Sequence, residues 1–385
     1  MMANLLLPNA DRSIGNYTLT AGSPAKPIGA WNRIAYAAAH VVADPLAACD
    51  PWIDMAIDWD TTLAFREHLW GQGLGVAEAM DTAQRGMGLD WSQSLELIQR
   101  STAVAQAGGH LIASGVGTDH LVADANTTID DVIAAYEMQC EAVEATGSRV
   151  ILMASRALCA VAKGPEDFAS VYERVLGGLQ QPAILHWLGE MFDPSLAGYW
   201  GSKDHLVAME TCLKILIANA NKIDGIKVSL LSAEKEISMR RRLPDGVVMY
   251  TGDDFNYPDL IKGDEHGFSH ALLGIFDPIA GAASQALSAL ATGDLKGYHA
   301  TFDPTVPLSR HIFRPPTRFY KTGVVFLAYL NGHQDHFTMI NGQESTRSTQ
   351  HLAEIVRLAN GARLFTDPDQ AAARASAVFA ARGVC

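Results

Sequence analysis

The sequence has few cysteines, and their arrangement suits neither a disulfide framework nor a zinc site. An odd number of them occur at wide spacings and never in a C-x-x-C pair; the five are Cys49, Cys140, Cys159, Cys212 and Cys385. Small secreted proteins and zinc-binding modules instead place cysteines in close, even-numbered sets. We therefore expect a protein of a reducing compartment.

Long apolar runs and basic clusters are also missing. Leu5-Leu6-Leu7 is the only apolar run near the start and is too short for a signal-peptide core, and no stretch approaches the roughly 20 apolar residues needed to span a bilayer. Basic residues number 29 against 42 acidic ones, a net charge of −13, and the largest basic group is Arg240-Arg241-Arg242, which we expect at the end of a helix. We therefore expect neither a nucleic-acid nor a membrane partner, and a cytoplasmic location.

Short apolar runs alternate eight times with longer segments of helical period. The predicted strands cover residues 33–42, 74–80, 110–117, 149–155, 182–188, 224–230, 246–253 and 267–274. The predicted helices between them cover 60–70, 92–106, 128–145, 165–176, 204–218 and 232–243. Eight such units require parallel strands with crossover helices and predict an α/β protein with a (β/α)8 TIM barrel. A doubly wound open sheet is the competing architecture, but no G-x-G-x-x-G follows the first strand.

The pattern changes at both ends of the predicted barrel, which we place at residues 31–277. Residues 1–30, rich in Asn, Gly and Pro, are interpreted as an N-terminal arm that embraces a neighbouring subunit or covers the base of the barrel. Residues 278–385 turn wholly helical and predict a C-terminal extension packed on the barrel. The helices expected there cover 280–292, 320–330, 349–359 and 370–381.

Lys227 is the residue that points most clearly to chemistry. It lies in the apolar run Ile223–Leu230, the sixth predicted strand. Burial lowers the pKa of an amine, and a neutral amine can attack a carbonyl to form a Schiff base, so the position indicates a class I aldolase or lyase. A structural alternative is a lysine that reaches solvent or pairs with Asp253 or Glu78.

Two short motifs lie on the sixth and seventh predicted strands, Gly225-Ile226-Lys227 and Thr251-Gly252-Asp253-Asp254. Together with Leu95–Ile98 and Ile112–Gly117, they resemble the dihydrodipicolinate synthase and N-acetylneuraminate lyase family, as a divergent subgroup, from about residue 33 to residue 330. The resemblance implies a TIM barrel, Lys227 as the Schiff-base lysine and no organic cofactor. It also implies a small carbonyl substrate and a homo-oligomer.

The sequence departs from this family at three places. Where the family has G-T-T-G-E after the second strand, this chain has Met80–Arg85, in which Thr82 is the only hydroxyl. The family's Y-N-x-P is replaced by His186–Gly189, so the resemblance transfers the tyrosine's proton relay to His186, whose unperturbed pKa suits acid–base catalysis. Met191 and Phe192 stand where the family synthases have an arginine. These changes favour a polyhydroxylated, sugar-derived substrate over the amino-aldehyde of lysine biosynthesis.

We therefore predict a carbon–carbon lyase in which Lys227 attacks a 2-oxo acid or a sugar-derived ketone. The predicted catalytic residues are Lys227, His186 and Asp253. The predicted substrate-binding residues are Thr82, Asp81, Glu78, Trp187 and Gly252.

Two other functions fit the same pattern. His40, Glu78 and His186 could hold a divalent metal in a sugar isomerase or hydrolase if their side chains converge at the barrel mouth. Strand alternation can turn any of them outward, however. The barrel could also be a non-catalytic ligand-binding protein. His333-Gln334-Asp335-His336 has metal-ligand residue types, but its loop position favours a solvated turn.

Overall fold

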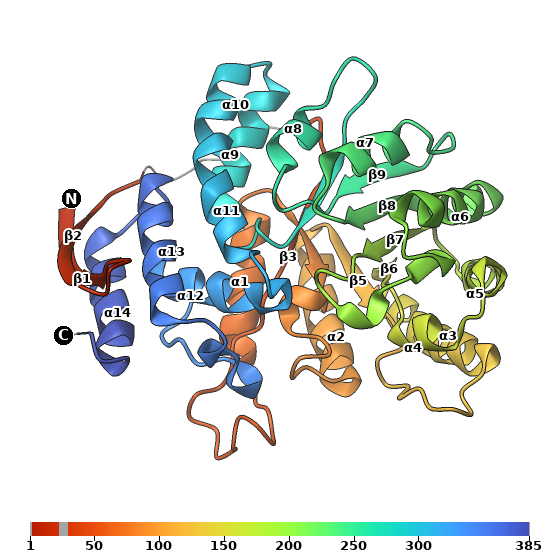
Figure 1. Ribbon diagram of the computed structural model, residues 1–385, viewed down its shortest axis with the longest axis horizontal. Coiled ribbons are helices and arrows are strands. Elements are labelled where there is room, and N and C mark those ends of the chain that lie inside the picture. The colour runs from red at the N-terminus through yellow and green to blue at the C-terminus, as the bar shows by residue number, and fades with distance from the viewer. Residues whose placement is uncertain (1, 23–29, 385) are drawn as a thin grey trace.

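The computed structural model describes residues 2–22 and 30–384, and eight parallel strands close into a barrel at its centre (Figure 1). The strands pair in the order β10-β3-β4-β5-β6-β7-β8-β9. Their bounds are β3 (Ala35–Ala38), β4 (Gly75–Glu78), β5 (Ile112–Val116), β6 (Arg149–Leu152), β7 (Ala183–Leu188), β8 (Ile223–Ser229), β9 (Val248–Thr251) and β10 (His270–Leu273). The prediction of a (β/α)8 barrel is confirmed, and each predicted strand contains or closely overlaps an observed one.

Helices surround the barrel and follow the predicted segments. They are α1 (Trp59–Gly71), α2 (Trp91–Gly108), α3 (Ile129–Glu144), α5 (Pro165–Gly178), α6 (His205–Ala218) and α7 (Ala233–Arg240). The start of α3 shows why such boundaries can be predicted from sequence, because Thr128 and Asp131 form a reciprocal capping box. Sequence periodicity missed α4 (Arg156–Val161) and α8 (Tyr257–Lys262), which are too short to display a helical repeat.

Apolar side chains fill the inside of the barrel below the site. Tyr36, Met80, Ile151, Tyr250 and Leu272 are among them, and each is at most 1 % exposed. A parallel register places Lys227 opposite His186 on β7 and Tyr250 on β9. Because side chains of paired positions leave the sheet on the same side, Lys227 and His186 both point into the barrel.

The C-terminal third forms a helical layer beside the α1 side of the barrel (Figure 1). It contains α9 (Ala280–Ala291), α10 (Leu295–Phe302), α11 (Val306–Ile312), α12 (Tyr320–Leu330), α13 (Thr349–Gly361) and α14 (Pro368–Ala381). Every residue of α12 is buried, and one apolar core runs from the barrel strands into these helices without interruption. In the part of the chain that the structure describes, no helix is long and apolar enough to cross a membrane.

The first residues form a hairpin that the sequence did not indicate. Strands β1 (Met2–Pro8) and β2 (Ile14–Thr20) pair antiparallel and pack on α13 and α14. Arg357 donates to the carbonyl of Pro8 at 2.8 Å. The described part of the predicted N-terminal arm thus lies on the C-terminal helices of its own chain, and residues 23–29 lie outside the described residues.

Candidate active site

Lys227 lies on β8 and lines a small cavity of about 10 Å3 at the carboxyl ends of the barrel strands, and it is only 7 % exposed. This end of a TIM barrel is where such enzymes carry their catalytic groups. The polar residues that line the cavity with Lys227 are Asp81, Thr82, His186, Ser229, Asp254 and Tyr320. They come from four barrel strands or the loops after them, and from the C-terminal helix α12.

Burial changes the acid–base properties of two of these groups. Desolvation lowers the pKa of Lys227 to about 8, although the charges of Asp254 and Asp81 oppose the shift. Desolvation also raises the pKa of Asp254 to about 7, opposed by a hydrogen bond from the Ile275 N–H and by the charge of Lys227. Burial thus disfavours the charged form of both groups, which favours a population of the neutral, nucleophilic amine.

Asp254, and not Asp253, is the carboxylate of the Thr251–Asp254 motif that lines this cavity. One oxygen of Asp253 accepts from the backbone N–H groups of Phe255 and Asn256, at 2.8 and 3.0 Å, and the other accepts from the Asn256 amide at 2.8 Å. The carboxylate of Asp253 therefore holds the turn after β9. Of the two carboxylates in this motif, the structure thus places Asp254, and not the predicted Asp253, in the cavity with Lys227.

His186 reaches the cavity as expected. Its Nε2 lies 3.1 Å from Ser229 Oγ, while its buried Nδ1 has no hydrogen-bond partner among the described residues. Burial, with the nearby charge of Lys227, holds the pKa of His186 well below its ordinary value, so the ring is neutral. The next residue, Trp187, alternates outward and packs its ring against Trp200. Trp187 therefore points away from the cavity in which it was expected to bind substrate.

The C-terminal helix α12 contributes two side chains that sequence reasoning missed. The hydroxyl of Tyr320 lies 2.8 Å from Thr82 Oγ1, and the amine of the buried Lys321 lies 3.1 Å from Asp81 Oδ2. Asp81 and Thr82 belong to a single 3-10 turn, η1 (Asp81–Ala83). Thr82 and Asp81 therefore line the cavity as predicted, and each has its partner on a helix about 240 residues later in the sequence.

Gly252 lies directly against the reactive lysine. A Cβ atom on Gly252 would come within 2.8 Å of Lys227 Cε and 2.2 Å of Ser229 Oγ. Real Cβ atoms do not approach that closely, so only glycine fits at this position beside the lysine. Gly252 shapes the wall of the cavity, consistent with its predicted place in the site.

The alternative metal ligands do not come together. Glu78 is fully buried between β4 and α1, where both of its oxygens lie 2.9 Å from the guanidinium of Arg66. His40 lies between Asp277, at 2.8 Å, and Gln334, at 3.1 Å. Glu78 and His40 therefore face away from His186, which corrects both the proposed metal set and the substrate-binding role of Glu78. Among residues 2–22 and 30–384, no group of three or more His, Cys, Asp or Glu side chains is arranged to hold a metal ion.

Comparison with known proteins places the whole chain in one family. A family model described as "Protein of unknown function (DUF993)" matches residues 5–384. The chain belongs to the DUF993 family. Among curated proteins, none matches it.

Members of the dihydrodipicolinate synthase family are among the solved structures that share the fold of this DUF993 protein. Dihydrodipicolinate synthase from Oceanobacillus iheyensis has a TM-score of 0.57 at 14 % identity, covering 81 % of this chain and 88 % of that one. A putative dihydrodipicolinate synthetase from Pseudomonas aeruginosa has 0.61 at 16 %, covering 87 % and 100 %. YagE of E. coli K12, a prophage protein belonging to the dihydrodipicolinic acid synthase family, was solved with pyruvate and has 0.61 at 13 %, covering 92 % and 100 %. At these identities the likeness shows the fold.

A second cavity of the DUF993 protein, about 110 Å3 in volume, adjoins the first and shares Asp81, His186 and Leu188 with it. Its lining is mixed, with apolar side chains such as Leu121 and Met153 beside charged ones. Arg85 is held by Asp119, at 2.7 Å, and Arg156 at the mouth is paired with Asp193. Because they share lining residues, the two cavities lie side by side between Lys227 and the half-exposed Arg156.

Proposed function

We propose that this DUF993 protein is a Schiff-base-forming lyase or aldolase that acts on a 2-oxo acid or a sugar-derived ketone. The observation that carries the proposal is the buried amine of Lys227, whose pKa is lowered to about 8 inside the barrel beside Asp254. The fold likeness supports it, because solved structures that share this fold include members of the dihydrodipicolinate synthase family, one of which holds pyruvate.

The reaction starts when Asp254 takes the proton of the Lys227 ammonium. The free amine then attacks the substrate carbonyl, a new N–C bond forms, and the carbonyl oxygen gains a proton to give a carbinolamine. Loss of that oxygen as water leaves an iminium, which draws electrons from the neighbouring carbon atoms. A C–C bond can then break toward the iminium, and the reverse sequence forms it.

Two groups are placed to move the remaining protons. Tyr320 shares a hydrogen bond with Thr82, and burial raises the pKa of Tyr320 well above its ordinary value, so it keeps its proton and can donate it. His186 is neutral, and its Nδ1 has no hydrogen-bond partner among the described residues, so the ring can pass a proton on through its two nitrogens without becoming a stable cation. We propose that Tyr320 and His186 share the relay that the sequence assigned to His186 alone.

The substrate extends from Lys227 into the adjoining cavity. Arg156 forms its mouth with a half-exposed guanidinium, of which only Nε is paired with Asp193 in the described residues. The remaining guanidinium N–H groups suit a carboxylate or hydroxyls at the far end of a sugar acid. This arrangement supports a sugar-derived substrate. Homo-oligomeric assembly stays a prediction that light scattering tests.

Reductive trapping tests the proposal directly. The protein is treated with borohydride in the presence of pyruvate and of 2-oxo-3-deoxy sugar acids, and its peptides are analysed by mass spectrometry. We expect a stable mass increase on Lys227 in the wild type, no increase in Lys227→Arg, and an unchanged result in Lys214→Arg, where the lysine is exposed on α6. Labelling of another lysine, or of none, contradicts the proposal, and labelling without turnover of any trapped compound favours the ligand-binding alternative.

A further inference from the structure

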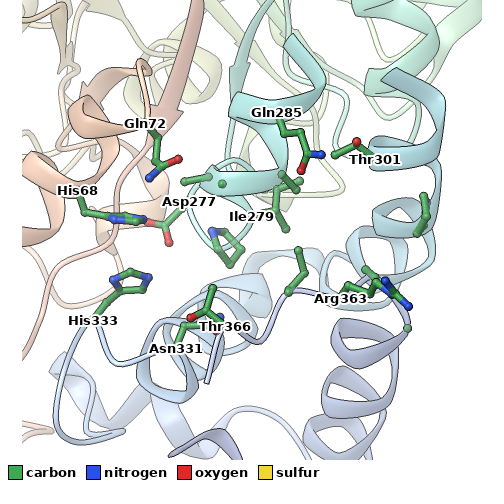
Figure 2. A pocket seen from close by; sticks show the side chains of 18 of the residues that line it. His68, Gln72, Asp277, Ile279, Gln285, Thr301, Asn331, His333, Arg363 and Thr366 are labelled. Atoms are coloured by element: carbon green, nitrogen blue, oxygen red, sulfur yellow. The ribbon is translucent and has the colours of Figure 1, made fainter. Parts of the chain in front are cut away.

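A cavity outside the barrel lies between α1, α9 and the C-terminal helices (Figure 2). Its volume is about 390 Å3, within the range of small-molecule sites. His68 and Gln72 reach it from the end of α1, and Asp277 reaches it from the loop after β10. It has no lining residue in common with the cavity around Lys227 among the described residues.

Two buried oxygen atoms of residues that line this cavity have no hydrogen-bond partner among the described residues. They are Oδ1 of Asp277 and Oε1 of Gln72. Asp277 is only 2 % exposed. Its other oxygen, Oδ2, accepts a hydrogen bond from the backbone N–H of His40 and lies 2.8 Å from His40 Nδ1. Because an unpaired buried acceptor costs about 1–3 kcal/mol, these two oxygens mark a place where a ligand's donors would be stabilising.

The lining also includes apolar residues such as Ile279 and Leu364, and its other polar groups can both donate and accept. The rings of His68 and His333 lie 4.2 Å apart, and burial lowers the pKa of both, to about 3 for His333, so both are neutral. A neutral imidazole offers one donor and one acceptor. The amides of Gln285 and Asn331 also line the cavity, and in Figure 2 they surround the same space as the two imidazoles and Asp277.

We propose that this cavity binds a small neutral polyol or monosaccharide. Hydroxyl groups both donate and accept, which matches unpaired acceptors at Asp277 and Gln72 together with amide donors at Gln285 and Asn331. Among the described residues, the lining carries one carboxylate, Asp277, and one guanidinium, Arg363, so it favours neither sign of ion overall. The neutral imidazoles add no charge that favours either sign of ion. The proposal of this site does not rest on the reaction proposed for Lys227.

Calorimetric titration with D-mannitol, D-glucose, putrescine and inorganic phosphate tests this proposal. We expect saturable one-to-one binding of a neutral probe, with a Kd of about 1 mM or tighter. Gln72→Met removes the unpaired oxygen and keeps the length of the side chain, so it is expected to weaken binding at least tenfold without lowering the unfolding temperature of the free protein. Gln180→Met, in an exposed turn, is the matched control and is expected to bind as the wild type does.

Three results would overturn the proposal: no saturable heat from either neutral probe, binding of only putrescine or phosphate, or equal affinity in Gln72→Met. The variant Lys227→Met is expected to bind the neutral probe normally. A failure of the Schiff-base chemistry therefore leaves this result unaffected, and the two proposals can fail separately.

Discussion

Strands β4 and β8 each carry a buried charged residue, and the two have opposite surroundings. Glu78 of β4 turns outward and meets Arg66 with both oxygens at 2.9 Å. Lys227 of β8 turns inward and forms no direct ion pair within 4 Å among the described residues, so burial lowers its pKa to about 8. A buried charge with a direct partner holds the structure together, whereas one left without such a partner is available for chemistry.

Replacing the inward lysine tests this contrast with the largest effect. Lys227→Met is expected to lower kcat/KM at least about 10^4-fold, because the nucleophile is lost. Its free energy of unfolding is expected to stay equal or rise, since a buried amine gives way to an apolar side chain of similar length. Steady-state kinetics with the substrate found by trapping, together with urea unfolding, measure both. A large loss of stability would show that Lys227 is structural, like Glu78.

Removing the outward carboxylate should have the opposite outcome. Glu78→Ala leaves Arg66 buried and unpaired, which is expected to cost about 3–5 kcal/mol of unfolding free energy. The double variant Arg66→Met with Glu78→Leu should recover most of that loss, because no unpaired charge remains. Chemical denaturation measures both variants. If the Glu78→Ala variant is as stable as the wild type, Glu78 is not structural and the contrast with Lys227 is wrong.

Asp254 sharpens the comparison, because its charge acts on Lys227 without a direct ion pair. In the wild type, kcat/KM is expected to rise as the pH rises through about 7 to 8, since the amine must lose its proton. Asp254→Asn should lower the rate on the order of 100-fold by removing the proton acceptor. It also removes a charge that favours the ammonium, so the rising limb should move to lower pH. An unchanged profile would exclude Asp254 from proton transfer.

Glu236 is a third buried ionisable residue, and its hydrogen-bond partners among the described residues are hydroxyl groups. Thr251 and Ser269 donate to its carboxylate, and burial raises the pKa of Glu236 to about 8. The folded state thus holds a proton that the unfolded state loses above its ordinary pKa, so stability falls as pH rises from about 4.5 to about 8. Glu236→Gln should remove this slope and gain on the order of 1 kcal/mol at pH 9. Parallel pH curves for the two proteins would contradict the assignment.

The sequence predicted the barrel because each strand is a short apolar run followed by a helical period, and this signal is local. It could not decide which way a strand residue faces. A shift of one residue turns a side chain to the other face, and this is why Trp187 and Glu78 were wrongly expected in the site.

The site was predicted less precisely than the barrel, because its residues are brought together by turns and by tertiary packing. Asp253 and Asp254 are adjacent, and only the turn after β9 decides which carboxylate reaches Lys227. Tyr320 and Lys321 begin a helix that no local pattern connects to Asp81 and Thr82. Tertiary packing of the C-terminal helices creates that part of the site, so single-sequence periodicity cannot reveal it.

The four-residue segment from Gly274 to Asp277 separates the two cavities. Gly274 lines the one around Lys227, the Ile275 N–H donates to Asp254 at 2.9 Å, and Asp277 lines the outer one. If a molecule in the outer cavity prefers one position of this segment, it changes the hydrogen bond that holds Asp254. Thermodynamic reciprocity then requires that occupancy around Lys227 alter affinity in the outer cavity by the same factor. Because this connecting segment is so short, heterotropic linkage between binding in the two cavities can be measured in the DUF993 barrel.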